Sequence, residues 1–146
     1  MKIEIDIDKK YSEMGVKVTA PDLTPDIERI ISLMRMIDMQ IPVKQDEETI
    51  ILDVGKILYI EAVERSTFVY TKENTYESAM KLYEFEQQLP EKDFIRVSKQ
   101  SILNLRKVKS LKTDINRKIR VTFLNGEQIV VSRMYAENLR KRLGIK

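Results

Sequence analysis

The sequence contains no cysteine and no histidine among its 146 residues. Without cysteine the chain can have no disulfide, thiolate metal site or cysteine nucleophile. Without histidine it lacks the commonest general base and the commonest transition-metal ligand. Its four glycines form neither a phosphate-binding loop nor a dinucleotide fingerprint. We therefore expect a protein that is not an enzyme and that needs no metal and no cofactor.

Long apolar runs are also missing, since none approaches the roughly 20 residues that a membrane-spanning helix needs. The first residues, MKIEIDIDKK, alternate apolar and charged side chains and lack the apolar core of a signal peptide. We expect the protein to be soluble and cytoplasmic.

Charge is distributed unevenly along the chain. Residues 1–54 contain 7 Lys and Arg against 12 Asp and Glu, whereas residues 55–146 contain 19 against 11. The basic residues are densest between Arg106 and Arg120, with a second cluster at 140–142. This asymmetry indicates an anionic partner for the second half, nucleic acid before a membrane surface, although a solvated basic surface explains it equally well.

The first 49 residues are predicted to form a small strand–helix extension. Isoleucine alternates with charged residues over 1–8, which predicts a half-buried strand, and 16–20 is a second short candidate. Thr24-Pro25-Asp26 has the composition of a helix start, and the helix should end before Pro42. Its apolar face is expected to comprise Ile27, Ile30, Ile31, Met34 and Ile37.

Residues 50–146 are predicted to form a separate domain rich in strands. Strands are expected over 49–54, 57–62, 67–71, 94–97, 102–105, 108–111, 118–124 and 128–131. Asn125-Gly126 predicts a hairpin in which both turn residues adopt positive φ. A helix over 76–89, ended by Pro90, should bury Ala79, Leu82, Tyr83 and Leu89, and a last helix should cover 134–143 after a Ser132 cap.

Two polar, basic segments interrupt these apolar strands. One is Arg96-Val97-Ser98-Lys99-Gln100-Ser101, and the other is Ser132-Arg133 at the start of the last helix. Side chains on loops held by a rigid sheet are typical recognition residues, although ordinary turns have the same composition. Arg96 has two interpretations, a contact with a partner or a structural ion pair.

Several motifs in the second half resemble the LytTR family of DNA-binding domains. They are Ile57-Leu58-Tyr59-Ile60-Glu61-Ala62, then Phe94-Ile95-Arg96-Val97-Ser98-Lys99, Asn104, Asn125-Gly126-Glu127 and Val131-Ser132-Arg133-Met134-Tyr135. The resemblance covers about residues 50–146. It implies a mainly β fold with peripheral helices, in which small sheets stack into an elongated domain. It also implies binding to promoter DNA through loops in successive major grooves, without a recognition helix.

The resemblance further implies which residues contact DNA. The first loop falls on Glu64-Arg65-Ser66-Thr67, so we expect Arg65 and Thr67 to contribute. The second loop supplies Ser98, Lys99 and Gln100, with Ser98 where many members have histidine, and the third supplies Arg133.

We therefore expect a sequence-specific transcriptional regulator that binds duplex promoter DNA with repeated half-sites, as a homodimer or as paired monomers. Residues 1–49 would serve dimerisation or bind a membrane or regulatory protein, although the same features suit a helix packed on its own domain. The alternative is an interaction module that does not bind DNA.

Overall fold

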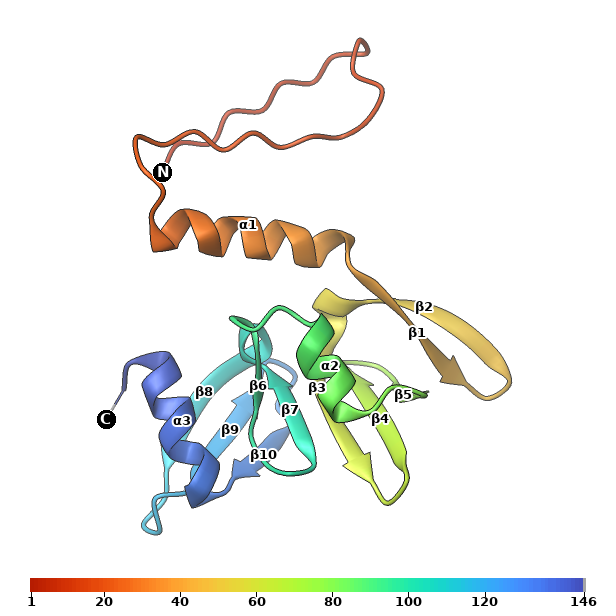
Figure 1. Cartoon of the computed structure of the whole chain (residues 1–146), viewed down its shortest axis with the longest axis vertical. Helices are drawn as coiled ribbons and strands as arrows, with labels where there is room; N and C mark the ends of the chain where they lie inside the picture. Colours follow the sequence, from red (N-terminus) through yellow and green to blue (C-terminus); the bar gives the residue numbers. More distant parts are fainter. Residues whose placement is uncertain (146) are drawn as a thin grey trace.

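The computed structural model describes residues 1–145 and contains two antiparallel sheets with three α-helices around them (Figure 1). Seven strands form the larger sheet in the order β2-β1-β5-β4-β3-β7-β6. They are β1 (Gln40–Gln45), β2 (Glu48–Asp53), β3 (Ile57–Val63), β4 (Ser66–Thr71), β5 (Thr75–Ser78), β6 (Phe94–Arg96) and β7 (Ser101–Asn104). The expectation of a mainly β fold with peripheral helices is confirmed.

The smaller sheet has three strands in the order β10-β9-β8. They are β8 (Val108–Thr113), β9 (Ile119–Phe123) and β10 (Gln128–Val131). The helices are α1 (Pro25–Asp38), α2 (Leu82–Gln88) and α3 (Arg133–Leu143), and two short 3-10 turns are η1 (Val54–Lys56) and η2 (Leu105–Lys107).

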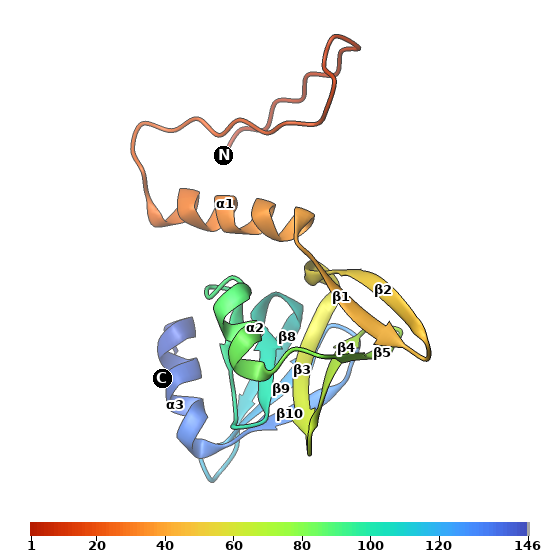
Figure 2. The same ribbon diagram turned by 45° about the vertical axis from the view of Figure 1, so that its right-hand side comes forward.

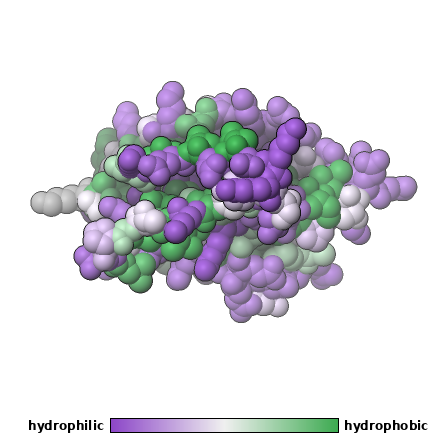
Figure 3. All heavy atoms as spheres, turned by 90° about the horizontal axis from the view of Figure 1, so that it is seen from above, coloured by the Kyte–Doolittle hydropathy of each residue, from purple (hydrophilic) through white to green (hydrophobic). Residues whose placement is uncertain are grey.

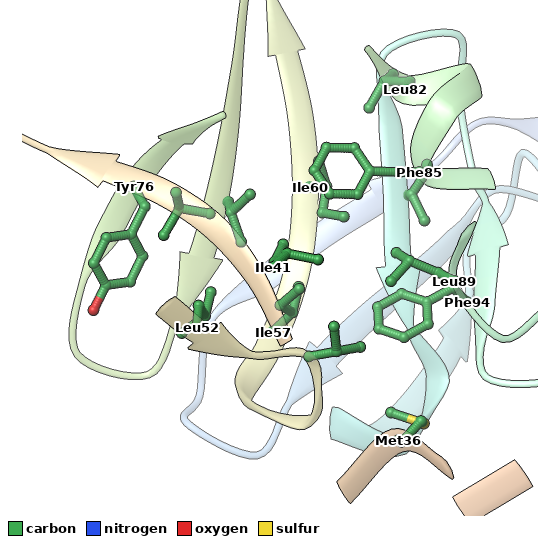
Figure 4. Close-up of a cluster of buried hydrophobic side chains, with 14 residues drawn as sticks. Met36, Ile41, Leu52, Ile57, Ile60, Tyr76, Leu82, Phe85, Leu89 and Phe94 are labelled. Atoms are coloured by element: carbon green, nitrogen blue, oxygen red, sulfur yellow. The ribbon is translucent and has the colours of Figure 1, made fainter. Parts of the chain in front are cut away.

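Two hydrophobic cores lie on opposite faces of the larger sheet. Because side chains alternate along a strand, Phe94 and Ile102 enter the first core, whereas Ile95 and Leu103 enter the second. The first core is covered by α1, α2 and the β1–β2 hairpin, and Figure 4 shows Phe85 of α2 in it. The second core lies between the sheets and α3.

Stacked aromatic rings connect the two sheets. The Tyr59 ring of β3 lies 4.3 Å from the Tyr70 ring of β4 and 5.4 Å from the Phe123 ring of β9, measured between centroids. Such offset pairs each contribute about 0.5–1.5 kcal/mol beyond the burial of their area. The stack therefore fixes the position of the smaller sheet against the larger one.

Helix α1 begins where the sequence predicted, with Thr24 at the N-cap position and Pro25 in the first turn. Its packing face differs slightly from the prediction, because Met36 is buried whereas Ile37 is 67% exposed. Lys92 also joins the helix to the domain through an ion pair with Glu28 at 3.2 Å. No helix within residues 1–145 combines the length and apolar character needed to cross a membrane.

The strands predicted over 1–8 and 16–20 are wrong. Both segments are extended and exposed, and they lie apart from the two sheets, above α1 (Figures 1 and 2). A strand needs a neighbouring backbone to satisfy its N–H and C=O groups, and the folded domain offers none at this position. In Figure 3, which views the molecule from this side, apolar atoms lie among polar ones on the surface.

A strand at 40–45 was missed because Pro42 argues against a strand interior. β1 pairs with β2 from Gln40↔Asp53 to Gln45↔Glu48, but its ladder with β5 is the single pair Lys44↔Glu77. On the β5 side Pro42 has no paired residue, so its missing backbone N–H costs no ladder hydrogen bond there. β1 precedes residue 50 and yet belongs to the large sheet, and the division of the chain into 1–49 and 50–146 stays a prediction.

The helix predicted over 76–89 is wrong in its first half. Thr75–Ser78 forms β5, which pairs with β4, and only Leu82–Gln88 is helical. Leu82 and Leu89 are buried as predicted, but Ala79 and Tyr83 are exposed and Phe85 takes the central position. The neighbouring strand β4 decides the conformation of 75–78, which a local pattern does not reveal.

The hairpin at Asn125-Gly126 is confirmed, with a different turn geometry. Gly126 has φ +92°, whereas Asn125 is not among the residues of positive φ. The Asn125 side chain instead accepts a hydrogen bond from the Glu127 backbone N–H at 3.1 Å. α3 begins at Arg133, one residue earlier than predicted, and the Ser132 side chain at its N-cap makes no capping hydrogen bond. The helix ends before Gly144, which has φ +69°.

Candidate nucleic-acid interface

All three predicted contact segments lie at one end of the sheets, here called the loop end, at the lower edge of Figures 1 and 2. The pairing explains two of them. The register pairs Val63 with Ser66 and Glu61 with Ser101, so the end of β3, the start of β4 and the start of β7 lie side by side. The third segment follows β10, which runs antiparallel to β9 and returns to the same end.

The β3–β4 turn presents Arg65 to solvent. The turn has two residues between the Val63↔Ser66 pair, and Glu64 adopts φ +57° there. Arg65 is exposed, and its guanidinium forms no ion pair with any residue of 1–145. A free cation at the tip of a rigid hairpin is suited to an anionic partner.

Thr67 does not belong to this surface, contrary to the prediction. It lies inside β4, opposite Ala62 and Ser78, and is 4% exposed. The alternation of the strand turns its side chain inward, so it offers almost no area to a partner.

The segment 97–100 is a tightly fixed loop between β6 and β7. Buried Val97 donates its backbone N–H to the Ser101 carbonyl at 2.9 Å, and the Gln100 carbonyl accepts from the Ala62 backbone N–H at 2.7 Å. The Ser98 hydroxyl accepts from the Gln100 backbone N–H at 3.1 Å, so part of its hydrogen-bonding capacity serves the loop itself. Lys99 and Gln100 are exposed at the tip.

Arg96 binds the backbone of this loop. Of its two interpretations, a partner contact or a structural ion pair, the contacts support the structural one. Its guanidinium donates to the Ser98 carbonyl at 2.8 Å and to the Lys99 carbonyl at 2.6 Å, and it forms an ion pair with Glu86 of α2. All three contacts lie within the protein, and together they connect α2 to the loop. Arg96 thus fixes the backbone on which Lys99 is presented.

Arg133 is the first residue of α3 and is exposed. Among residues 1–145 its side chain has no ion-pair partner. The first N–H groups of a helix lack intrahelical partners and carry partial positive charge, so an anion near Arg133 would meet both. Burial of Ala136 and Leu139 anchors the helix that carries it.

The basic stretch 106–120 does not form one patch. Arg106 lies in η2, at the opposite end of β7 from the 97–100 loop, and it pairs with buried Asp93 at 2.9 Å. Arg117 lies in the β8–β9 turn at the loop end, where it pairs with Glu137 at 2.8 Å. Sequence reasoning grouped these cations by proximity along the chain, but β8 separates them in space.

Shifted pKa values arise from packing and from ion pairs. Burial raises the pKa of the Tyr59 phenol, with the Glu127 carboxylate adding to the effect, and burial likewise raises the pKa of Tyr70. The hydrogen bond from Arg117 lowers the pKa of the Glu137 carboxyl. Glu137 therefore stays ionised and keeps its two arginine partners in place.

Two comparisons with known proteins, one of sequence and one of structure, identify the same family. The sequence profile of the LytTr DNA-binding domain matches residues 47–144. The structure superposes with a TM-score of 0.70 on the LytTr DNA-binding domain of a methyl-accepting/DNA response regulator from Bacillus cereus, which is 32% identical. That match covers 73% of this chain and 97% of the Bacillus chain.

Full-length relatives are also found in Staphylococcus aureus. Uncharacterised HTH-type transcriptional regulators from strains MSSA476 and NCTC 8325 are each 26% identical over 147 residues, covering 99% of both chains. Their names refer to a helix-turn-helix. In residues 1–145 of the present chain, strands separate every two successive α-helices, so no such motif is formed there.

Proposed function

The chain belongs to the LytTR DNA-binding domain family, and from this we propose that it is a sequence-specific transcriptional regulator that inserts loops into the major groove of duplex DNA. The observation that carries the proposal is the convergence of Arg65, Lys99 and Arg133 on the loop end. Each is exposed on a connection that a sheet or a helix holds firmly. Rigid presentation matters, because bases are distinguished by side chains at fixed positions.

We propose that some of the exposed loop-end residues contact bases and that others contact phosphates. Arg133 is suited to a bidentate contact with guanine, whereas Lys99 and Arg65 are suited to guanine or to phosphate. Gln100 can bind adenine through its amide, and Ser98 adds a less selective contact, because its hydroxyl can donate or accept. Thr67 supports the first loop without touching DNA.

We further propose that two copies act together on repeated half-sites, through residues 1–49. This segment exposes apolar side chains that its own domain leaves uncovered, among them Ile5 at 80%, Ile7 at 91% and Ile37 at 67%. Single exposed apolar residues are ordinary on a protein surface, but several within residues 1–49 indicate a binding partner. The same observation supports the alternative, a module that binds another protein and not DNA.

The decisive experiment is a fluorescence-anisotropy titration with the duplex upstream of the protein's own coding region, against a scrambled duplex, near physiological salt. We expect a preference of about a hundredfold or more, since specific DNA-binding proteins typically prefer their sites by about 10³–10⁷-fold. Sequences selected from a random pool serve as a second source of operator.

A matched pair of variants localises the interface. Lys99→Ala and Lys72→Ala remove the same charge, but Lys72 follows β4 at the end of that strand away from Arg65. Only Lys99→Ala should weaken binding. Equal, weak and salt-labile binding to every duplex would reject the proposal and favour the protein-binding alternative.

A further inference from the structure

A fourth connection also reaches the loop end, the β8–β9 turn at residues 114–117 (Figures 1 and 2). The turn is well formed, because the Asp114 N–H donates to the Lys118 carbonyl at 2.8 Å and the Arg117 N–H donates to the Asp114 carbonyl at 3.0 Å. Arg117 adopts φ +63° there. The turn lies beside α3, whose first residue is Arg133.

A buried arginine attaches this turn to α3. Arg140 is 3% exposed, and its guanidinium donates to the Arg117 carbonyl at 2.9 Å and to the Glu137 carboxylate at 2.8 Å. Arg117 donates to the same carboxylate at 2.8 Å. Desolvating a guanidinium is costly unless hydrogen bonds compensate. Both terminal nitrogens of Arg140 are bonded in this way, whereas its buried Nε has no partner within residues 1–145, so the contacts that hold the turn come from the terminal nitrogens.

The turn presents a side chain that has no packing partner in its own domain. Ile115 is 101% exposed, and Asn116 and Lys118 on either side of Arg117 are exposed as well. One exposed isoleucine on a mobile loop would mean little. Here the isoleucine lies on a fixed turn, at the same end of the domain as the three loops proposed to bind DNA.

We propose that residues 114–118 form a fourth DNA contact, in which Lys118 binds a backbone phosphate and Ile115 packs against a base edge carrying a thymine methyl group. Apolar side chains contact that methyl group in the major groove, and lysine binds phosphate as a point charge. Arg140 is the positioning residue of the contact. The inference rests on the proposed function, because it needs a DNA-binding loop end.

The test uses Ile115→Ser in the full chain, with Leu124→Ser as its matched control. Leu124 is 61% exposed in the β9–β10 turn, at the opposite end of β9. We expect Ile115→Ser to weaken operator binding about five- to tenfold, the effect of roughly 1 kcal/mol, and Leu124→Ser to leave it unchanged. Deoxyuridine in place of the contacted thymine should weaken the wild type equally and have no added effect on Ile115→Ser.

Arg140→Met tests the positioning role. Its partner Glu137 is 54% exposed and retains Arg117, so the substitution leaves no buried charge unpaired, and we expect a little-changed melting temperature with weaker operator binding. If Arg140→Met loses both stability and operator binding, Ile115→Ser becomes the deciding variant, because the Ile115 side chain is fully exposed and packs against nothing in the fold.

Two failures are distinguishable. If the wild type shows no sequence preference, the proposed function itself is wrong. If the wild type is specific and Ile115→Ser, Lys118→Ala and the deoxyuridine duplex all bind as the wild type does, only the fourth contact is wrong.

Discussion

The strongest prediction concerns Arg96, which we expect to control DNA affinity without touching DNA. Arg96→Ala removes two hydrogen bonds to the carbonyls of Ser98 and Lys99 and the ion pair with Glu86. Hydrogen bonds from charged groups contribute about 1.5–3 kcal/mol each in buried settings. The Arg96 side chain is 27% exposed and water can replace it on both carbonyls, so we take about 1 kcal/mol for each bond.

These two bonds together favour the ordered loop by about 2 kcal/mol. When the competent conformation of a binding loop falls to a fraction of the population, the apparent Kd rises by the inverse of that fraction. The loss therefore raises Kd by up to about 30-fold, since about 1.4 kcal/mol is a factor of ten, and by less to the extent that the remaining loop bonds keep it ordered. Arg96→Lys can reach one carbonyl and should give an intermediate value.

The assay is anisotropy with the operator and with every single-base variant of it, after circular dichroism has confirmed folding. Glu86→Gln is the control, because it removes the ion pair and leaves both carbonyl bonds intact. A partly exposed pair is worth about 0–1 kcal/mol, so this variant should stay within about fivefold of the wild type. An unchanged Kd for folded Arg96→Ala would refute the reasoning. A loss of discrimination at one base pair only would also refute it, because Arg96 would then contact that base directly.

Four further results are expected. Arg133→Ala should cost about 1–3 kcal/mol at one operator position and relax specificity there, whereas an equal loss on all sequences would make it a phosphate contact. Lys99→Ala should reduce the salt dependence of log Kd by about one phosphate contact, measured between low and physiological salt. Phe85→Ala should lower the free energy of unfolding by about 3–5 kcal/mol in a urea titration, because Phe85 is fully buried, whereas exposed Tyr83→Ala should change it by less than about 0.5 kcal/mol. Tyr59 has a raised pKa in the folded protein, so its contribution to stability is complete below about pH 10, where the unfolded phenol titrates, and declines at higher pH. Tyr59→Phe should flatten this alkaline decline, and an unaltered pH profile would contradict it.

Local signals in the sequence determined much of the secondary structure. Thr24-Pro25 starts α1, Asn125-Gly126 joins β9 to β10, and Gly144 ends α3, as their composition indicated. Each of these signals acts within a few residues, through a restricted φ, a cap or a turn, so no distant neighbour is needed to express it. The ordered motifs of residues 50–146 likewise sufficed to identify the family.

Tertiary pairing decided the cases in which the local pattern failed. Residues 1–8 have the alternation of a strand but belong to neither sheet and form no ladder within residues 1–145. Residues 75–78 resemble the start of a helix and are a strand, because β4 lies beside them. A strand exists only with a partner, so its own sequence is never sufficient evidence.

The candidate interface shows the same division. The sequence identified Arg65, Lys99 and Arg133 as basic residues on connections between strands and helices, and the structure leaves all three exposed. Only the tertiary structure distinguished Arg96, Arg106 and Arg140, which look no different along the chain, as groups that hold carbonyls and carboxylates within the protein. The physical reason is that an arginine's role depends on which acceptors surround its guanidinium, and the folding of distant strands brings those acceptors together.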